Sequence, residues 1–371
     1  RCFLGWGEQQ AYTYSEVAQY YGVSWYNSLI DSGLGEFRDN VLGKTDGTRV
    51  AAAYSFGQLG MPFDNVVADI YGIKYILSDY IVNDVNWELV KKVDEKYLYK
   101  NKSLNTVGLF YSEWCHEEEY NRMTEQERKA YPAYGVVLQD DQMEDNMQER
   151  ITIPQFSVSQ DFDEIELYGQ EVVLELNNNW NEKENNQVFL TATIFSREEG
   201  QVKIMCDTGF GFSDIYWAQE IFELNANEEN DIFMKIPSDT KNVKLVFDDA
   251  GETIIDDLLT KTSLGCNYTN ENLSLSIDNT DGKISGQINA EKKGILMIPI
   301  CVNKGWKAWV DGQETDILKA DYAFMAIKID EGEHIIELKY HTPGFRVGAV
   351  ISLAGIVLWS GMVGIGVLKY N

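Results

Sequence analysis

The feature that most constrains this sequence is an uncharged stretch close to its C-terminal end. The 22 residues from Val347 to Leu368 contain no charged side chain, and Arg346 and Lys369 flank them. A helix of that length reaches about 33 Å, enough to cross a hydrocarbon core roughly 30 Å thick. A buried core helix or a pair of strands is the alternative. The stretch has no polar face, however, and it is rich in glycine, as helix contacts in lipid are. The sequence therefore predicts one transmembrane helix over 346–369.

The chain as a whole is strongly acidic. It holds 59 Asp and Glu against 31 Lys and Arg, so its 371 residues have a formal net charge of −28. This charge argues against a protein that grips nucleic acid phosphates, and DNA and RNA are not expected partners. At roughly 100–200 residues per domain, the length predicts two or three domains. Because the sequence begins at Arg1 and shows no signal peptide, we expect a piece of a longer protein whose upstream segment carries it across a membrane.

Residues that usually hold metals or form disulfides are sparse. The five cysteines are scattered without a CxxC spacing, and the chain has three histidines. We expect small core residues rather than a disulfide framework or a zinc site. The motifs of serine hydrolases, phosphate-binding loops and zinc proteases do not occur. The sequence thus predicts no metal and no cofactor, and it identifies no catalytic residue.

Residues 1–150 have the pattern of a mixed α/β domain. The stretch from Pro62 to Gly72 places apolar side chains on one helical face and ends at a glycine. The residues that follow alternate as in a strand. Further on, Thr124 and Glu127 have the spacing of a capping box, which predicts the start of a short helix.

Aromatic residues are unusually frequent near the start of the chain. Such rings can line a sugar-binding cleft, pack a core or lie near lipid headgroups. We name four of them as candidate glycan-binding residues and keep core packing and the membrane interface as alternatives. These candidates are Trp6, Tyr12, Trp25 and Tyr26.

In the segment 151–262 the apolar residues alternate with a period of two. Runs such as 188–194 and 232–236 are separated by clusters of Asn, Asp, Glu and Gly, which is typical of an antiparallel β-sandwich. The last runs, with Asp256 and Asp257 near the final one, are similar to the end of a jelly-roll carbohydrate-binding module. Acidic pairs at strand ends are common, so this similarity predicts a fold and identifies no site.

The segment 263–345 predicts a second β-sandwich unit next to the membrane. Asp311-Gly312 lies between apolar runs, and this pair indicates a hairpin because a type I′ turn needs positive φ. Trp306 and Trp309 are further candidate glycan-binding residues, with a structural role as the main expectation. Their spacing places them on opposite faces of one regular strand, so at least one should be buried. Together the segments predict an α+β chain: a mixed α/β domain, two antiparallel sandwich units and a C-terminal transmembrane helix.

Two blocks of the sequence, one near each end, contain distinctive motifs. The stretch from Gly305 to Leu353 contains a Gly-Trp strand in GWKAWVDG, a Phe-containing strand in DYAFMAIKI, and Pro-x-Phe-x-x-Gly before the last helix. Nearer the N-terminal end are YNSLIDSGLGEFRDNVLG and IYGIKYILSD. These blocks resemble the C-terminal extracytoplasmic region of the YfhO family of bacterial multispanning membrane proteins. The family's Gly-His turn is interrupted here by Glu333, a one-residue departure that is compatible with the same turn.

The resemblance implies a polytopic protein of the GT-C glycosyltransferase type in the bacterial cell membrane, with its soluble domains outside the cytoplasm. Such a protein uses a polyprenyl-phosphate sugar to modify a cell-surface polymer such as teichoic acid. Its catalytic carboxylates usually lie in a first extracytoplasmic loop that is absent from this sequence, so no catalytic residue is carried over. The implied partners are the lipid bilayer, the polyprenyl-phosphate sugar and the cell-surface glycopolymer.

A second class of function remains open from the sequence. The same domains can form a non-catalytic ectodomain, anchored by one helix, that binds envelope glycans or has a structural role. The sequence upstream of Arg1 separates the two classes. Many hydrophobic spans with an acidic first loop would support the enzyme, and a single span would exclude it.

Overall fold

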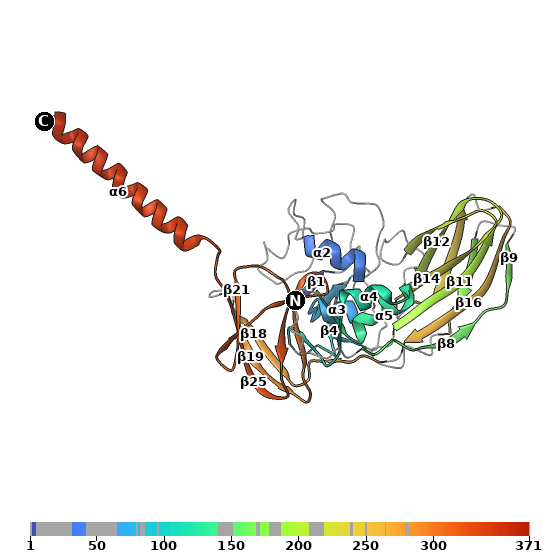
Figure 1. Cartoon of the computed structure of the whole chain (residues 1–371). Helices are drawn as coiled ribbons and strands as arrows, with labels where there is room; N and C mark the ends of the chain where they lie inside the picture. Colours follow the sequence, from blue (N-terminus) through green and yellow to red (C-terminus); the bar gives the residue numbers. More distant parts are fainter. Residues whose placement is uncertain are drawn as a thin grey trace.

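The structure is a computed structural model in which strands predominate over helices (Figure 1). It describes residues 2–4, 32–41, 65–78, 81, 86–94, 96–104, 106–139, 151–167, 171–177, 187–207, 219–237, 240–248, 251–263, 265–278 and 282–370.

Two sheets that share one hydrophobic cluster form most of what we call the body, the described part outside 156–263. The seven-stranded sheet has the order β17-β5-β20-β24-β23-β7-β6, and the five-stranded sheet has the order β18-β19-β25-β21-β22. Residues of both, such as Leu296 and Leu338, belong to one buried cluster. The strands of the seven-stranded sheet are β5 Leu109–Tyr111, β6 Trp114–His116, β7 Val136–Leu138, β17 Tyr268–Thr269, β20 Gly294–Cys301, β23 Leu318–Ala320 and β24 Phe324–Ile329. Those of the five-stranded sheet are β18 Leu273–Asp278, β19 Lys283–Ala290, β21 Trp306–Val310, β22 Gln313–Thr315 and β25 Gly332–Tyr340.

The seven-stranded sheet joins the two segments predicted as separate domains. Strands β5, β6 and β7 come from residues 1–150, and the other four come from 263–345. Tyr111 of β5 pairs with Ile295 of β20, and Leu138 of β7 pairs with Ala320 of β23. The alternation of apolar residues indicates a strand but not its partner. The two predicted segments therefore share one sheet.

This sheet is buried on both faces at its centre. Along β20, Leu296 and Ile298 enter the cluster shared with the five-stranded sheet, whereas Ile295 and Met297 enter the larger cluster on the opposite face. A strand covered on both sides has a nearly continuous apolar sequence, as ILMIPI does. Gly294, where β20 begins, lies so close to β5 that a Cβ would be 2.2 Å from the Tyr111 carbonyl oxygen.

The segment 156–263 is inserted between β7 and β17 of this sheet, and we call it the inserted unit. As described, it consists of two antiparallel sheets, β14-β11-β16-β8 and β10-β15-β12-β13, with β9 also paired with β16. Its strands are β8 Phe156–Asp161, β9 Ile165–Leu167, β10 Glu171–Glu175, β11 Gln187–Ser196, β12 Gly200–Asp207, β13 Gln219–Leu224, β14 Glu228–Ile236, β15 Asn242–Asp248 and β16 Thr253–Ser263.

The strand order of the inserted unit brings its two ends together. Numbered along the chain with β9 left out, the strands are ordered 1-8-3-6 in one sheet and 2-7-4-5 in the other. The first and last strands are neighbours, and Phe156 pairs with Ser263. Next to this pair, the hydroxyl groups of Tyr134 and Ser263 lie 2.6 Å apart, and the Asn267 amide donates to the Ala133 carbonyl oxygen at 2.8 Å. The unit thus leaves the body and returns to it at one place.

Helix α5, Glu125–Ala130, holds the inserted unit against the body. It begins at the predicted capping box, in which Thr124 and Glu127 bond reciprocally. Lys129 Nζ donates to the Phe233 carbonyl oxygen of β14 at 2.9 Å. Ala130 packs against Phe189 and Phe233, whose stacked rings have centroids 4.9 Å apart. These contacts add to the largest buried hydrophobic cluster, which contains residues of both parts, such as Tyr134 and Ile236.

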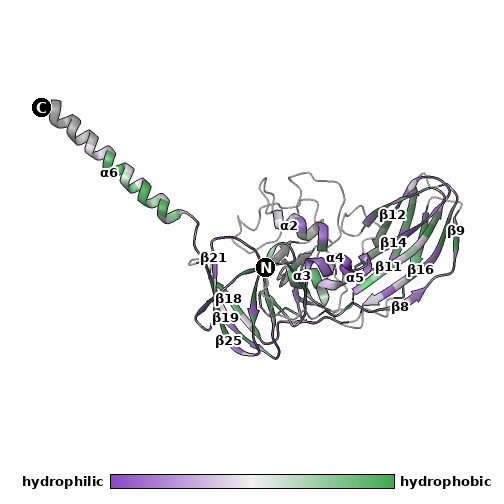
Figure 2. Cartoon of the chain, in the orientation of Figure 1, coloured by the Kyte–Doolittle hydropathy of each residue, from purple (hydrophilic) through white to green (hydrophobic). Residues whose placement is uncertain are grey.

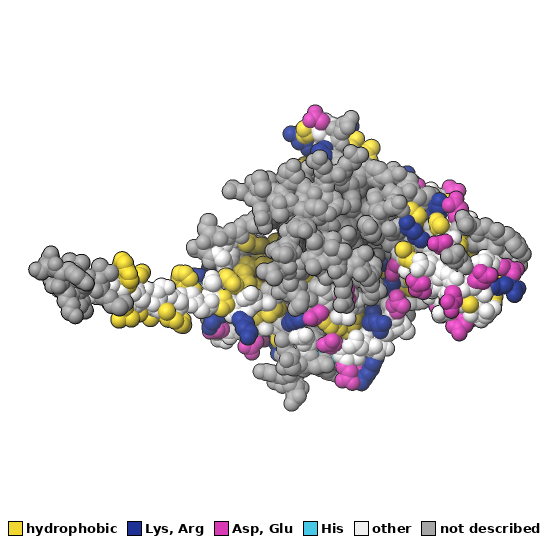
Figure 3. Space-filling view, turned by 90° about the horizontal axis from the view of Figure 1, so that it is seen from above, with side chains coloured by type: hydrophobic (Ala, Val, Ile, Leu, Met, Phe, Trp, Pro, Cys, Tyr) yellow, Lys and Arg dark blue, Asp and Glu magenta, His cyan; other side chains and the backbone are white. Residues whose placement is uncertain are grey.

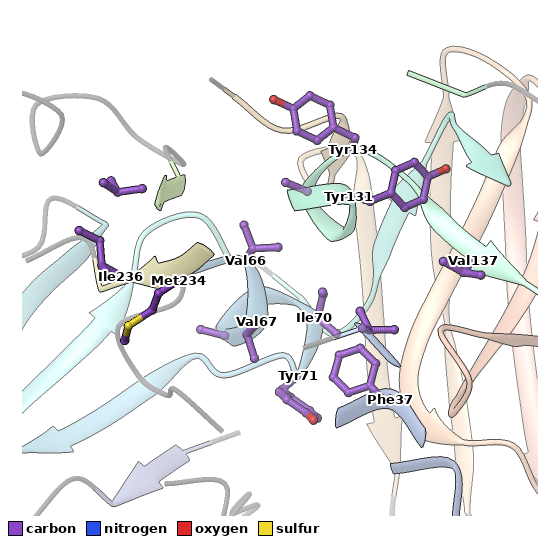
Figure 4. Packing of buried hydrophobic residues seen from close by; sticks show 14 of the residues in the cluster. Phe37, Val66, Val67, Ile70, Tyr71, Tyr131, Tyr134, Val137, Met234 and Ile236 are labelled. Carbon is purple, nitrogen blue, oxygen red and sulfur yellow. The ribbon is translucent and has the colours of Figure 1, made fainter. Parts of the chain in front are cut away.

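The predicted helix before Gly72 is confirmed as α3, Asn65–Ile70. Gly72 ends it with φ of +66°, and β2, Tyr75–Ser78, follows. The rings of Phe37, Tyr71 and Phe324 meet edge to face, with centroids 5.0–5.7 Å apart, and so join the end of α3 to β24. Figure 4 shows Phe37 and Tyr71 together in this cluster. The remaining described elements are the sheet β1-β2-β4-β3 with β1 Cys2–Leu4, β3 Trp87–Val93 and β4 Lys96–Asn101, and the helices α2 Ser32–Glu36, η1 Phe37–Val41, α4 Glu117–Arg122 and η3 Tyr131–Ala133.

Helix α6, Phe345–Tyr370, extends away from the body (Figure 1). Its apolar side chains from Phe345 to Trp359 are 60–71% exposed, and Figure 2 shows them as the hydrophobic part of the helix. Among the residues that the structure describes, no helix combines the length and the apolar character needed to cross a membrane.

Asp321 and Tyr322 form an unusual turn between β23 and β24. Both have positive φ, 46° and 64°, where short hairpins prefer Asn and Gly. Asp321 is 1% exposed, its Oδ1 accepts a hydrogen bond from the Val137 amide at 2.8 Å, and its Oδ2 accepts none from any described residue. Burial raises the pKa of Asp321 to about 7, although the Val137 amide acts in the opposite direction.

Replacing Asp321 with Asn is expected to remove a pH dependence of stability. The folded chain binds a proton at this carboxyl more readily than the unfolded chain does, so the stabilisation is present at low pH and is lost as the pH rises toward 7. From about pH 5 to about pH 8, the native sequence should lose about 2 kcal/mol of unfolding free energy relative to Asp321→Asn. Urea unfolding followed by tryptophan fluorescence measures the difference. An equal pH dependence of both proteins would contradict the raised pKa.

Candidate functional site at the base of helix α6

Two of the six candidate glycan-binding residues can be placed. Trp306 and Trp309 lie on β21, while Trp6, Tyr12, Trp25 and Tyr26 lie outside the described residues. The two tryptophans lie on opposite faces of the strand, as expected. Trp306 packs against the cluster between the two body sheets, and Trp309 lies on the outer face. Both are half-buried, so the expectation that at least one would be buried is wrong.

Glycine at position 305 allows the base of the site to close. A Cβ there would lie 2.5 Å from the Tyr340 ring and 2.6 Å from the His341 carbonyl oxygen. Because Gly305 has no side chain, its carbonyl oxygen can accept a hydrogen bond from the His341 amide at 2.7 Å. Trp306 then packs on Tyr340 with ring centroids 5.4 Å apart. This contact fixes the end of β25. Four residues, 341–344, separate it from the start of α6.

Three lysines form a row across the outer face of the five-stranded sheet. Lys339 of β25 is opposite Lys283 of β19 on one side and opposite Lys307 of β21 on the other. The residues next to them in sequence, Ile284, Ala308 and Leu338, are fully buried, so the lysines point outward. Opposite Cβ atoms in such a ladder are about 5 Å apart. We call Lys283, Lys307 and Lys339 the lysine row.

The lysine row is only partly neutralised by acidic neighbours. Lys283 Nζ lies 2.8 Å from Glu337, and Lys307 Nζ lies 2.6 Å from Glu314. Lys339 has no ion-pair partner among the described residues and is exposed. Like charges directly opposite each other in a sheet are destabilising. An anion bound across the row would relieve that repulsion.

A hollow lies between Lys307, at one end of the lysine row, and the first turn of α6. Its volume is about 650 Å³, and Lys307, Trp309, Tyr340, His341 and Phe345 form much of its wall. The site thus combines basic side chains, rings with polar edges and the start of an apolar helix. Lys and acidic side chains lie near the base of α6, beside the hydrophobic side chains of the helix (Figure 3). Aromatic and basic residues of this kind are typical of a membrane–water boundary.

The far end of the same sheet has a different electrostatic character. At the confirmed Asp311-Gly312 hairpin, where both residues have positive φ, Asp311 accepts a hydrogen bond from the Ile335 amide and contacts His334 Nδ1 at 2.7 Å. The Ile335 hydrogen bond first, and His334 second, hold the pKa of the Asp311 carboxyl below its usual value. The lysine row thus lies at the α6 end of the sheet, and the structural carboxylate of Asp311 lies at the other end.

The side chains at the base of α6 combine positive charge with an apolar surface. Across the described ranges, no group of three or more His, Cys, Asp and Glu side chains is placed to hold a metal ion. The arrangement at the base of α6 is therefore suited to binding an anion with an apolar attachment. The sequence alone does not predict the lysine row, because its three lysines are far apart in the chain and become neighbours only through strand register.

Comparison with known proteins places the chain among bacterial membrane proteins. A sequence model of the family described as "Bacterial membrane protein YfhO" matches residues 15–352. The chain therefore belongs to the YfhO family. The "Uncharacterized protein YfhO" of Bacillus subtilis strain 168 is 37% identical over 76 residues, which is 20% of this chain and 9% of that protein. The chain thus matches a small part of that relative's length.

Two solved structures have a distant similarity. The arabinofuranosyltransferase AftD from Mycobacteria has a TM-score of 0.16 at 10% identity, over 45% of this chain and 22% of that one. Latent PorU from Porphyromonas gingivalis has a TM-score of 0.14 at 8% identity, over 69% of this chain and 27% of that one. TM-scores this low support no argument about fold or function.

The two tryptophans of β21 form a matched pair for a stability test. Trp306→Ala should lower the free energy of unfolding by about 2–3 kcal/mol, somewhat less than for a fully buried ring, because the side chain packs on the core cluster and on Tyr340. Trp309→Ala should cost less than about 1 kcal/mol, because its ring lies on the outer face. Chemical unfolding followed by circular dichroism measures both. A larger loss from Trp309→Ala would contradict the assignment of faces.

Proposed function

We propose that this chain is the extracytoplasmic, membrane-facing part of a YfhO protein and that it binds the phosphate of a lipid-linked sugar at the bilayer surface. In this role it assists the transfer of the sugar from a polyprenyl-phosphate donor to a cell-surface polymer such as teichoic acid. The observation that carries the proposal is the lysine row beside the first turn of α6.

The charge pattern supports an anionic ligand at this place. The chain has a net charge of −28. The lysine row, with one unpaired lysine, is therefore a local region of positive charge on a negatively charged molecule. An anion near one lysine at a membrane surface gains about 1 kcal/mol, and the gain falls as salt is added. A phosphate joined to a polyprenyl chain fits both the row and the apolar helix that begins beside it.

The position of α6 supports a membrane-surface role. Its sequence contains the uncharged stretch 347–368, and its apolar side chains as far as Trp359 face outward. Water exposure of so many contiguous apolar groups is unfavourable, which favours a lipid environment for α6. Residues 341–344 are the connection between β25 and α6, so an anchored helix would hold the lysine row close to the headgroups.

The inserted unit favours the alternative, a non-catalytic ectodomain that binds envelope glycans or is structural. Its strand order, 1-8-3-6 and 2-7-4-5, supports the assignment of a jelly roll, an architecture shared with lectin domains. Between its outer face and α5 lies a cleft of about 630 Å³ lined by polar residues such as Thr193, Asp231 and Lys261. Sugar transfer by the full-length protein separates the candidates. Transfer that is unchanged after loss of the lysine row would favour the non-catalytic role.

Neutralising the lysine row is expected to weaken binding of a lipid phosphate. With farnesyl phosphate as the probe and the chain in a nonionic detergent, K339Q should raise Kd about fivefold. The triple variant K283Q/K307Q/K339Q should raise it about a hundredfold at low salt, at about 1 kcal/mol per lysine. Isothermal titration measures the affinity, with farnesol as the uncharged control ligand.

The matched control for these variants is Lys293→Gln. Lys293 is also exposed, but it pairs with Asp330 at 3.0 Å and lies outside the lysine row. Its replacement should leave the affinity unchanged. Equal affinity for farnesyl phosphate and farnesol, or full affinity in the triple variant, would refute the proposed phosphate site.

Removing residues 346–371 tests the anchor separately. The shortened chain should stay in the aqueous phase, whereas the whole chain should float with phosphatidylcholine vesicles, because a span of about 22 apolar residues partitions into lipid. Flotation in a density gradient at high salt distinguishes the two. A shortened chain that still floats would show that the anchor lies elsewhere.

A further inference from the structure

A second hollow lies in the body at the edge where its two sheets meet. Its volume is about 300 Å³, and it is bounded by β5 and β17 of the seven-stranded sheet and by β18 and β19 of the five-stranded sheet. Four asparagines, Asn267, Asn270, Asn272 and Asn289, contribute to its wall. We call it the asparagine pocket. None of its lining residues belongs to the lysine row or to the hollow at the base of α6.

Main-chain hydrogen bonds fix the asparagines around the pocket. The Asn267 amide donates to the Ala133 carbonyl oxygen at 2.8 Å, where the chain returns from the inserted unit. The Asn289 amide donates to the Asn272 carbonyl oxygen at 3.0 Å, which joins β19 to the turn before β18. The backbone is therefore held on two sides of the pocket. The side chains of Asn267, Asn272 and Asn289 remain exposed, and no hydrogen bond joins them to another described residue.

Asn270 is the buried asparagine of the pocket wall. Its side chain is 4% exposed, and its Nδ2 donates to the Ser103 carbonyl oxygen at 2.8 Å. Its Oδ1 is buried and accepts no hydrogen bond from any described residue. A buried acceptor without a donor is costly, and each such group in a folded protein requires an explanation. The Asn270 Oδ1 is closed off from solvent, so Asn270 serves as a wall residue fixed to Ser103.

The chemistry of the pocket fits a sugar ring. Each asparagine side chain offers a donor and an acceptor side by side without net charge, and neighbouring sugar hydroxyls offer the same pair in return. Leu273 and Ile288 provide an apolar part of the wall for the C–H face of a ring. The volume lies at the lower end of the range for ligand sites, which suits one ring rather than a chain. The pocket's one cation, Lys292, is accompanied by Glu271 and Glu291, so a phosphate finds no net positive charge here.

We infer that the asparagine pocket binds one neutral pyranose ring, held by the side-chain amides of Asn267, Asn272 and Asn289. This inference does not depend on the proposed phosphate site, because the two sites share no residue. A sugar in the pocket would lie beside the point where the inserted unit rejoins the body.

Saturation-transfer NMR with the whole chain tests the inference. The probes are glucose, galactose and N-acetylglucosamine, in a polyoxyethylene detergent that carries no sugar headgroup. We expect at least one of them to bind with Kd of about 1 mM, as is usual for a single small ring. The double variant N272A/N289A should weaken this binding at least tenfold, because it removes two of the three exposed amides.

Two controls make the result decisive. Asn121→Ala changes an exposed asparagine on α4, outside the pocket, and should leave binding intact. K283Q/K307Q/K339Q should also retain sugar binding, which keeps this test separate from that of the lipid phosphate. Thermal unfolding checks that N272A/N289A is folded, and N267A provides a second reading of the same pocket. Binding by none of the three sugars, binding that survives both pocket variants, or displacement of the sugar by inorganic phosphate would overturn the inference.

Discussion

The pairing of β5 with β20 is the contact on which the rest of the body depends. It joins residues that are separated by the whole inserted unit, with Tyr111 opposite Ile295. Closing so long a loop costs little more entropy than closing a moderate one, because the cost grows only with the logarithm of length. The gain is large, since β20 and β24 bury alternate side chains in two clusters on opposite faces of one sheet. The asparagine pocket takes part of its wall from this sheet.

Charge is distributed unevenly over this framework. The acidic composition sets the sign of the molecule, yet strand register gathers three lysines at the α6 end of the five-stranded sheet. The asparagine pocket is close to neutral, and Asp321 is a buried acid whose pKa is raised to about 7. Each of these environments follows from burial or strand pairing rather than from local sequence. Electrostatic repulsion of a polyanionic polymer would therefore act over much of the surface and be weaker at the base of α6.

Local signals in the sequence predict local structure well. The Thr124–Glu127 capping box, the glycine end of α3 at Gly72 and the Asp311-Gly312 hairpin are confirmed, because each depends on residues a few positions apart. Trp306 and Trp309 lie on opposite faces for the same reason. The division into separate segments did not reveal the shared seven-stranded sheet, since periodicity identifies strands without their partners. The lysine row and the asparagine pocket were missed because they exist only after distant segments are brought into register.

The single attachment of the inserted unit has a consequence for the order of folding. Each strand within 156–263 has its hydrogen-bonded neighbours inside that segment, so the unit can complete both of its sheets as soon as residue 263 has been synthesised. The seven-stranded sheet has to wait for β20 and β24, and the last helix follows later still. A growing chain would therefore hold β5 without its partner β20, and β7 paired only with β6, while the completed inserted unit lies between them and their later partners. The risk of aggregation is greatest while residues 263–329 are being synthesised. The segments that form β25 and α6 follow after that.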